Sequence, residues 1–386
     1  MQFDFLKFIG WLLLVGSAVG CIYLCYATLA VRRFARRRRP QLRGAGPVSI
    51  LKPLCGKDAE LYENLKSFCQ QNYPAWQIVF GVQEPRDPAI PVVHRLIEEC
   101  PRVDIALVVD GLRHGGNLKV ANLQNMLPSA SHDLIVMADS DMRVTQDYLA
   151  EITAPLHDPA TGLVTCLYRG LPAGGVWSKL ACAYINHGFL PQAVVAEEIG
   201  VGAGCFGATI ALRRETLAAI GGFATIRDAL ADDHALGAAV RRAGLKVELS
   251  PYLVDNIIVE PSLSALFRHE LRWARTIRII APAGFAASVV TQPTVLAFAA
   301  VAIGTLPWAV AIGLLATALA CRAVTVHLTD RSLRLRSTPL WLMPFRDMLS
   351  FAVFVVSFFS RTVAWRDRTF RIGKNGQMTL DGDKPA

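Results

Sequence analysis

The sequence predicts an α/β domain with a mostly parallel sheet, combined with transmembrane helices on its N-terminal and C-terminal sides. Two observations lead to this prediction. In the middle of the chain, short β-rich apolar runs alternate with helix-like segments, which is the pattern of a parallel sheet covered on both faces. Long apolar segments flank that part, and the 386 residues are 53% hydrophobic with a mean hydropathy of +0.35. Such a chain can hold an ordinary core plus several membrane segments.

A first transmembrane helix is expected within residues 1–31, because residues 5–30 are almost wholly apolar and long enough to cross a bilayer core. One lysine, Lys7, lies near the start of this run and six arginines follow it, whereas a signal peptide carries its positive charge first. Residues 32–44 are therefore predicted to be a basic linker on the cytoplasmic side. The formal charge of +9 gathers beside apolar segments, which indicates membrane orientation and argues against a nucleic-acid partner.

The nine cysteines form no C-x-x-C pair, and their number is odd. This pattern fits reduced thiols facing a cytosol better than a disulfide framework or a zinc site. The sequence gives no indication of the oligomeric state.

A soluble domain is expected over residues 45–260. Its predicted strands are the β-rich apolar runs at 48–54, 76–82, 103–109, 133–139 and 162–168. Helical spacing follows two of them, at 58–71 and 90–100. In open parallel sheets, ligands bind at the carboxyl ends of the strands, so the residues that follow these runs are the first candidates for a site.

The run at 133–139 ends in two carboxylates, Asp139 and Asp141, one residue apart. Such a pair can converge on one hard divalent cation, and Mg²⁺ or Mn²⁺ prefers carboxylate oxygen together with phosphate oxygen. The sequence therefore predicts a cation at this strand end that in turn holds a diphosphate. Short acidic pairs also cap helices and occupy turns, so the motif alone does not decide.

A glycine-bearing loop at 114–126 runs into a predicted helix. Its glycines allow close backbone approach, and a helix N-terminus favours anions. Lys119 adds a positive charge where a nucleotide phosphate would lie. The alternative is an ordinary turn with a solvated lysine.

A glycine-containing segment at 204–223 is predicted to form a tight turn, a strand and a short helix. It is followed at 229–244 by an amphipathic helix that Asp232 and Asp233 open. Acids at this position often cap a helix and stabilise its dipole. We expect Asp232 to cap this helix and Asp233 to point into the cleft.

An amphipathic interfacial helix is expected within residues 261–285, because leucines and a phenylalanine alternate there with four arginines and a histidine. Arg272 and Trp273 stand together in it. Contact with phospholipid and an aromatic belt are the alternative explanation for this pair. Residues 171–203 either cover a lipid-binding groove or form a loop with one buried helix.

C-terminal membrane segments are expected over residues 286–364, followed by a tail at 365–386. Residues 293–328 are too long for one span and suit a tight hairpin of two. The apolar run at 340–359 is interrupted by Arg346 and Asp347, and an ion pair inside a span must face protein or water. Arginine clusters before and after that run both favour the cytoplasm, so three to five spans in total are compatible with the sequence.

The order of these motifs resembles the membrane glycosyltransferases of the GT-A type, specifically the ceramide glucosyltransferase family (family 21). That family carries three aspartate motifs followed by (Q/R)-x-x-R-W. The resemblance covers roughly residues 45–280. The matching residues are Asp104 in "VDIAL", Asp139 and Asp141 in "ADSDMRV", Asp233 in "ADDHA", and "HELRW" at 269–273. Two departures are His269, where the family has Gln or Arg, and Asp232, where Glu is more usual.

Within this family the chain looks most similar to the bacterial hopanoid-biosynthesis-associated glycosyltransferases. The segments that carry this likeness are "TCLYRGLPAGG" (165–175), "CFGATIALRRETL" (205–217) and "LADDHALG" (230–237). The resemblance implies a Rossmann-like GT-A catalytic domain on the cytoplasmic side of a bacterial inner membrane. It also implies inverting transfer of N-acetylglucosamine from UDP-N-acetylglucosamine to a lipid acceptor, bacteriohopanetetrol.

In this interpretation Asp233 is the base that takes the proton of the lipid hydroxyl, and Asp139 and Asp141 are the metal ligands for Mg²⁺ or Mn²⁺. Asp104 contacts uridine, with Glu84 and Asp87 as rivals. Three further residues close around the diphosphate or the acceptor, namely Lys119, Arg272 and Trp273.

Three other functions share these motifs. A ceramide or sterol glucosyltransferase that uses UDP-glucose differs only in sugar and acceptor. A processive polysaccharide synthase has more membrane helices, so the short C-terminal region argues against it. A lipid-binding membrane scaffold on a GT-A fold has no physical need to keep every metal ligand and the base, so the intact acids favour an enzyme.

Overall fold

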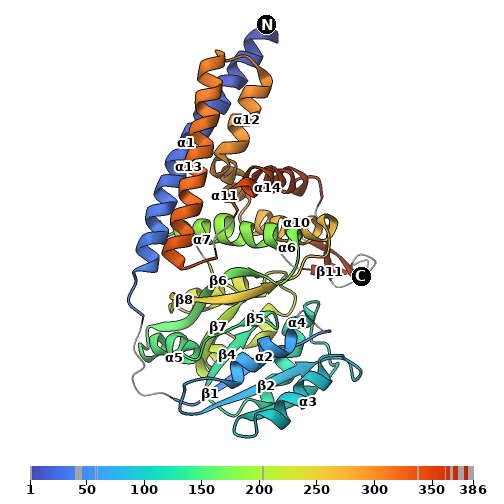
Figure 1. The fold of residues 1–386 in the computed structure, drawn as a ribbon. Coiled ribbons are helices and arrows are strands. Elements are labelled where there is room, and N and C mark those ends of the chain that lie inside the picture. The colour runs from blue at the N-terminus through green and yellow to red at the C-terminus, as the bar shows by residue number, and fades with distance from the viewer. Residues whose placement is uncertain are drawn as a thin grey trace. The chain divides into compact units, whose positions relative to one another are not determined.

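The computed structural model describes residues 2–39, 46–56, 58, 60–201, 204–336, 339–360, 362–365, 368–372 and 378–380. The chain forms two compact units (Figure 1). The sheet unit contains Arg37–Gly175, Ala203–Val259 and Ala364–Ala386, and the helical unit contains Met1–Arg36, Val176–Gly202 and Glu260–Val363. Residues 176–202, which the sequence places inside the soluble domain, thus group with the helices. The predicted linker at 32–44 and tail at 365–386 lie partly outside the described residues.

Eight described strands of the sheet unit form one sheet in the order β3-β2-β1-β4-β7-β6-β8-β5. Strands β1 to β4 are parallel to one another, and β6 is parallel to β8. Strand β7 is antiparallel to β4 and β6, and β5 is antiparallel to β8. The expectation of a mostly parallel sheet is confirmed. The strands are β1 Val48–Pro53, β2 Trp76–Val82, β3 Asp104–Val109, β4 Leu134–Ala138, β5 Met142–Arg143, β6 Thr161–Pro172, β7 Thr209–Arg213 and β8 Lys246–Ile258.

All five apolar runs predicted as strands are strands, although β6 extends four residues beyond the predicted 162–168. The strand and short helix expected within 204–223 are also present. Strand β8 was not predicted, because it contains a proline and alternates charged with apolar residues in a way that does not distinguish a strand from a loop. It pairs with β6 along most of its length, and this long-range pairing compensates for the weak local signal.

Helices cover both faces of this sheet, and the two-residue period of the strands divides their side chains between two buried clusters. In β4, Val136 belongs to the cluster beneath α2 and α3, whereas Ile135 and Met137 belong to the one beneath α4 and α9. The helices of this unit are α2 Leu61–Cys69, α3 Ile90–Glu99, α4 Leu118–Met126, η1 Leu127–Ser129, α5 Tyr148–Thr153, η2 Ala154–His157, α8 Arg214–Ala219, η4 Phe223–Ile226 and α9 Asp232–Arg242.

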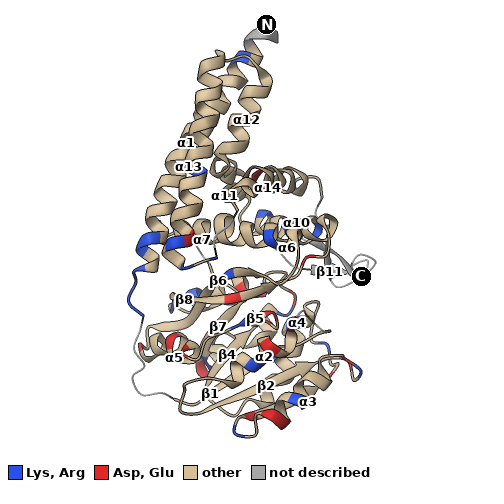
Figure 2. Ribbon diagram, viewed as in Figure 1, with Lys and Arg blue, Asp and Glu red and all other residues tan. Residues whose placement is uncertain are grey.

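In the helical unit, α1 (Gln2–Ala35) packs along α12 (Pro293–Ile303) and α13 (Trp308–Leu333). Figure 2 shows these three helices without charge along most of their length. Three helical segments of the described chain, Phe5–Ala35, Trp308–Leu333 and Leu340–Ser357, are long and apolar enough to cross a membrane. A fourth crossing exists if Pro282–Thr291 and Pro293–Ile303, which meet at 68°, form one broken span.

The remaining helices of this unit are α6 Val176–Tyr184, η3 Ile185–Phe189, α7 Leu190–Glu198, α10 Leu263–Ile280, α11 Pro282–Ala287, η5 Ser288–Thr291, η6 Leu340–Leu342 and α14 Met343–Ser357. Elements α6, η3 and α7 follow one another without a break, so the loop considered for residues 171–203 is instead helical over most of its length. A separate three-stranded sheet consists of β9 Thr362–Trp365, β10 Arg368–Ile372 and β11 Met378–Leu380.

The charges in the middle of α14 do not form a pair with each other. Arg346 makes two 2.7 Å hydrogen bonds to the Glu270 carboxylate of α10, and Asp347 accepts a 2.8 Å bond from Arg322 of α13. The side chains of Arg346 and Glu270 are 1% and 3% exposed. The two charges therefore face protein, as the sequence requires, but each is neutralised by a different helix.

Candidate active site

Strand β4 leaves the core in a tight turn at the carboxyl edge of the sheet. The backbone carbonyl of Asp139 accepts hydrogen bonds from Met142 N at 3.3 Å and from Lys52 Nζ at 2.6 Å. Because side chains alternate along the strand, Asp139 points to the face that α4 and α9 cover. The turn sends Asp141 toward β8, where its Oδ2 atom accepts a 2.8 Å bond from Asn256. The two acids therefore lie on the same turn, but their side chains contact different groups.

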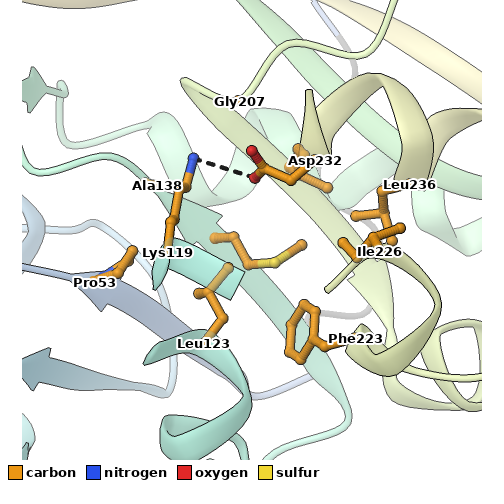
Figure 3. Close-up of a pocket in the computed structure, with 11 residues that line it drawn as sticks. Pro53, Lys119, Leu123, Ala138, Gly207, Phe223, Ile226, Asp232 and Leu236 are labelled. Atoms are coloured by element: carbon orange, nitrogen blue, oxygen red, sulfur yellow. Dashed lines mark ion pairs between the residues drawn. The ribbon is translucent and has the colours of Figure 1, made fainter. Parts of the chain in front are cut away.

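Lys119 links the strand-end acid to α9. Its Nζ atom lies 2.6 Å from Asp139 Oδ1 and 3.6 Å from Asp232 Oδ2. Figure 3 shows the second of these ion pairs, with Lys119 and Asp232 facing each other across the site. Burial alone would lower the pKa of Lys119, but the Asp139 and Asp232 carboxylates raise it well above its usual value. The alternative considered from the sequence, an ordinary turn with a solvated Lys119, is therefore wrong for this side chain.

Asp233 points toward the segment that precedes β7. Its Oδ2 atom accepts a hydrogen bond from Gly207 N at 2.9 Å, and its Oδ1 atom accepts one from His234 N at 2.7 Å. Gly207 lies beside both charged groups, because a methyl group there would be 3.4 Å from Asp233 Oδ2 and from Lys119 Nζ. These contacts bring Asp233, Lys119 and Asp139 into one cluster.

Asp232 does not cap α9, as the sequence suggested. The N-cap residue is Ala231, which forms no side-chain cap. Asp232 instead accepts a 3.4 Å bond from Asn117 Nδ2 in addition to its pair with Lys119. It therefore joins the N-terminal ends of α4 and α9.

Two carboxyls at this edge of the sheet, those of Asp141 and Asp233, have pKa values far above the usual range for aspartate. Burial, followed by the charge of Asp232, raises the pKa of Asp233 to about 6, although Lys119 and two backbone amides oppose this shift. Burial, followed by the charge of Asp139, raises the pKa of Asp141 to about 6. Strong shifts of this kind in a strand-end cluster are typical of catalytic and ligand-binding carboxylates.

Lys52 is a site residue that the sequence analysis missed. Its side chain is fully buried under the turn, with Nζ 3.7 Å from the centre of the Phe68 ring and bonded to the Asp139 carbonyl. Burial lowers the pKa of Lys52 to about 7, against the opposing charges of Asp139 and Asp141. A lysine inside the apolar strand "SILKPL" was the available signal, since a buried charge requires a partner.

Several backbone donors of the glycine loop before α4 are bonded within the chain. Asn117 caps α4 by accepting from the backbone N–H groups of Lys119 and Val120, at 3.0 and 3.2 Å. Gly116 N donates to Asp228 Oδ1 at 2.8 Å. A methyl group on Gly115 would lie 2.7 Å from the Arg227 carbonyl oxygen. The loop's glycines thus allow residues 227–229 to pass closely, and its backbone donors are used within the chain.

Asp104 is not part of this cluster, and its predicted contact with uridine is not supported. It is the first residue of β3 and pairs in register with Gln77 near the start of β2. Since β2, β3 and β4 are parallel, Asp104 lies at the amino edge of the sheet, opposite to the edge where Asp139 lies.

Glu84 and Asp87, the two rivals of Asp104, follow the carboxyl end of β2. Asp87 is buried and accepts hydrogen bonds from the backbone N–H groups of Gly56 and Ala89, so it shapes the turn. Glu84 is exposed. Of the two rivals, Glu84 is therefore the one that is available to a ligand.

Arg272 and Trp273 lie on α10, in the helical unit. Ser262 caps this helix by accepting from Ala265 N at 3.1 Å, and one buried face contains Leu266, Glu270 and Ala274. The amphipathic helix expected at 261–285 is present in this form.

The Trp273 ring lies 4.3 Å from the His269 ring and 6.3 Å from the Tyr184 ring, measured between centroids. His269 Nδ1 lies 2.7 Å from Glu260 Oε1. The histidine that departs from the family motif therefore supports the tryptophan of that motif.

A small cavity lies directly beneath the acid cluster (Figure 3). Its volume of about 10 Å³ leaves room for about one water molecule. A cavity of this size is too small to hold a nucleotide sugar. The residues that line the cavity are Pro53, Lys119, Leu123, Met137, Ala138, Gly207, Ile210, Phe223, Ile226, Asp232 and Leu236.

The acids fit a divalent cation that arrives with a phosphate. Within the described ranges, no group of three or more His, Cys, Asp or Glu side chains is arranged to hold a metal ion. Mg²⁺ usually takes only one or two carboxylates, together with water and substrate phosphates. Asp139 and Asp141 provide two carboxylates on one turn, close enough for the charge of Asp139 to act on Asp141, which meets this requirement.

A mostly parallel sheet with acidic residues gathered at the carboxyl edge is the arrangement of a GT-A glycosyltransferase. A solved structure with a similar fold is the mannosyltransferase PcManGT from Pyrobaculum calidifontis, in complex with GDP-Man and Mn²⁺. It has a TM-score of 0.55 and 20% identity, over 92% of this chain and 99% of that one.

The profile of glycosyl transferase family 21 matches residues 12–378. The chain belongs to this family.

Two curated relatives come from Caenorhabditis elegans. Ceramide glucosyltransferase 3 is 26% identical over 67% of this chain and 56% of its own length, and ceramide glucosyltransferase 1 is 22% identical over 86% and 72%. An N-acetylglucosaminyltransferase of Bradyrhizobium diazoefficiens (strain USDA 110) is 25% identical over 59% of this chain and 48% of its own length. The chain thus spans about half to three quarters of the length of these relatives.

Proposed function

We propose that the chain is an inverting transferase that moves N-acetylglucosamine from UDP-N-acetylglucosamine to a hydroxyl of a membrane lipid, bacteriohopanetetrol. The observation that carries this proposal is the cluster of Asp233, Lys119 and Asp139 at the carboxyl edge of the sheet. The sugar and the lipid come from the resemblance of three sequence segments to the hopanoid-associated enzymes, and the bacterial N-acetylglucosaminyltransferase among the relatives agrees with the sugar.

In the proposed reaction, Asp233 removes the proton of the lipid hydroxyl. The hydroxyl oxygen then forms a bond to the anomeric carbon while the bond from that carbon to the diphosphate breaks, and UDP leaves with the bonding electrons. Hydrogen bonds from Gly207 N and His234 N hold the base in one orientation, which lowers the entropic cost of reaching the transition state. Lys119 places a positive charge beside the leaving diphosphate.

A Mg²⁺ or Mn²⁺ ion held by Asp139 and Asp141 would neutralise charge on the departing diphosphate. Lys52 fixes the backbone of the turn that carries both acids. Glu84 is the proposed contact for uridine, and Arg272 and Trp273 remain proposed contacts for the diphosphate or the acceptor. We place the sheet unit on the cytoplasmic side of a bacterial inner membrane, because six arginines follow the first apolar helix.

The test is a transfer assay with the purified chain in detergent, Mn²⁺ and a panel of two donors and two acceptors. Bacteriohopanetetrol and ceramide are each incubated with UDP-N-acetylglucosamine and with UDP-glucose, and the masses of the lipid products are measured by mass spectrometry. We expect the mass of one N-acetylhexosamine to be added to bacteriohopanetetrol. A hexose added to ceramide would favour the activity that the nematode relatives' names describe. Binding of lipid without transfer from any donor would favour a scaffold.

Glu84→Ala is expected to weaken UDP binding about tenfold, whereas Asp104→Ala leaves it unchanged, because only Glu84 lies at the carboxyl edge of the sheet. Calorimetric titration with UDP and Mn²⁺ measures both affinities. If Asp104→Ala binds UDP more weakly than Glu84→Ala does, the assignment of Glu84 as the uridine contact is wrong.

The rate should rise with pH through a value near 6. The pKa of Asp233 is about 6 because of its burial and the neighbouring Asp232, and only its deprotonated form accepts a proton. At saturating Mn²⁺, kcat/KM should therefore fall about tenfold for each pH unit below 6. A profile of kcat/KM from pH 4.5 to 8 checks this, and an inflection near pH 4 would contradict it.

The raised pKa values of Asp141 and Asp233 also make the stability of the chain depend on pH in a defined direction. Because the pKa values of Asp141 and Asp233 are raised on folding, the native chain binds protons more tightly than the unfolded chain between about pH 4 and 6. These two groups therefore make the free energy of unfolding decrease as pH rises through this range. Thermal unfolding of Asp233→Asn, which removes one of them, should show a weaker dependence on pH there.

A further inference from the structure

Lys119 is bound to the carboxylate on which the proposed function depends for its cation. Its Nζ atom lies 2.6 Å from Asp139 Oδ1, and its second partner, Asp232 Oδ2, lies 3.6 Å away. The base of the side chain is fixed, because Lys119 is the second residue of α4 and its backbone N–H bonds to the Asn117 cap.

A divalent cation on Asp139 would lie very close to this ammonium group. A Mg²⁺–oxygen bond is about 2.1 Å long, so for a cation on the Oδ1 atom that Lys119 contacts at 2.6 Å, the two positive centres would be at most about 4.7 Å apart. The side chains of Lys119 and Asp139 are only 22% and 33% exposed, so water screens this repulsion weakly. Lys119 and a cation therefore compete for the Asp139 carboxylate.

We propose that Lys119 exchanges Asp139 for the diphosphate of the donor, so that the cation and the nucleotide sugar bind as a pair. This inference rests on the proposed function, which supplies both ligands. The diphosphate offers the ammonium group a new anionic partner at the moment when the cation takes the carboxylate. Asp232 keeps the ammonium group close to the site throughout, and the missing side chain of Gly207 leaves space beside Nζ.

The exchange makes each ligand raise the affinity for the other. The cation alone binds weakly because it must displace Lys119, and by linkage the nucleotide gains the same factor in affinity from the cation. Lys119 thus has two opposite effects, since it opposes the cation alone and favours the nucleotide.

The test measures Mn²⁺ binding to the full chain in detergent by electron paramagnetic resonance, with and without UDP. In the wild type, UDP should tighten Mn²⁺ binding about tenfold or more. In Lys119→Met, Mn²⁺ alone should bind about tenfold more tightly than in the wild type, UDP should bind more weakly, and the coupling between them should shrink. Unchanged or weaker binding of Mn²⁺ alone to this variant would overturn the proposal.

Two further variants separate exchange from a general effect of charge. Lys119→Arg keeps the positive charge and should keep the weak binding of Mn²⁺ alone. Lys52→Met removes a positive charge that contacts the Asp139 backbone and not its carboxylate, so the coupling to UDP should persist. A gain in Mn²⁺ affinity in Lys52→Met equal to that in Lys119→Met would overturn the exchange.

Thermal unfolding identifies any variant that does not fold, and Lys119→Arg suffices if Lys52→Met fails. If UDP does not bind the wild type at all, the proposed nucleotide is wrong. The comparison of Mn²⁺ alone then still decides whether Lys119 opposes the cation.

Discussion

Asp233→Asn is expected to lower kcat for sugar transfer about a thousandfold, while the KM for the donor stays close to that of the wild type. The amide has nearly the same shape as the carboxylate but accepts no proton from the lipid hydroxyl. The variant should unfold at a temperature close to that of the wild type, because burial already favours the neutral form of this carboxyl. Single-turnover transfer followed by mass spectrometry measures the rate.

Asp232→Asn is the matched control for this prediction, because it removes the same charge one residue earlier. Asp232 contacts Lys119 at 3.6 Å and Asn117 at 3.4 Å, and in the proposed reaction it has no proton to accept. We expect a loss in kcat of about tenfold. Equal losses in the two variants would mean that the charge of the acidic pair matters and that Asp233 is not the base.

Arg346→Met is expected to lower the free energy of unfolding of the helical unit by about 3–5 kcal/mol, because it leaves the Glu270 carboxylate buried without its partner. Arg346 also donates to the Leu180 carbonyl, so the same side chain holds α14, α10 and α6 together. Unfolding in mixed detergent, followed by circular dichroism, gives the free energy.

The double variant Glu270→Leu with Arg346→Met should recover most of this loss, because an apolar pair of similar size leaves no buried charge. Arg33→Ala, which breaks the more exposed Arg33–Glu198 pair, should have a far smaller effect. If Arg346→Met and Arg33→Ala shift the unfolding curve equally, the buried Arg346–Glu270 pair does not hold α14 and α10 together.

Most strands of the sheet could be predicted from sequence, because buried parallel strands appear as continuous apolar runs, and the runs at 48–54 and 76–82 are of this kind. Strand β8 could not, since its formation depends on pairing with β6, about 85 residues earlier in the chain. The π-helix η3 between α6 and α7 could not be predicted either, because no local sequence pattern indicates it.

Part of the site was also accessible from sequence. Asp139, Lys119 and Asp233 were chosen by motif. In the structure Lys119 lies 2.6 Å from Asp139, and Asp233 accepts a 2.9 Å hydrogen bond from Gly207 N beside them. Asp104 was chosen by the same motif logic, but its place at the start of β3 puts it at the wrong edge. Which end of a strand a residue occupies is therefore as important as its type.

Contacts between distant segments could not be predicted. Lys52 bonds the backbone of Asp139, and Asn256 bonds the side chain of Asp141 from 115 residues away. Neither Glu270 nor Arg346 indicates its partner, because their pairing depends on how α10 and α14 pack. Local patterns predicted the acids of the candidate site, whereas the groups that hold those acids became visible only in the folded chain.

The central claim is a single displacement at the sugar carbon with Asp233 as the base. The most direct measurement is the anomeric configuration, by proton magnetic resonance, of the glycolipid that the purified chain makes from UDP-N-acetylglucosamine. The sugar of this donor is α-linked, so one displacement predicts a β-linked lipid, and Asp233→Asn should make almost none of it. An α-linked product, or a β-linked product formed equally fast by Asp233→Asn, would contradict the account.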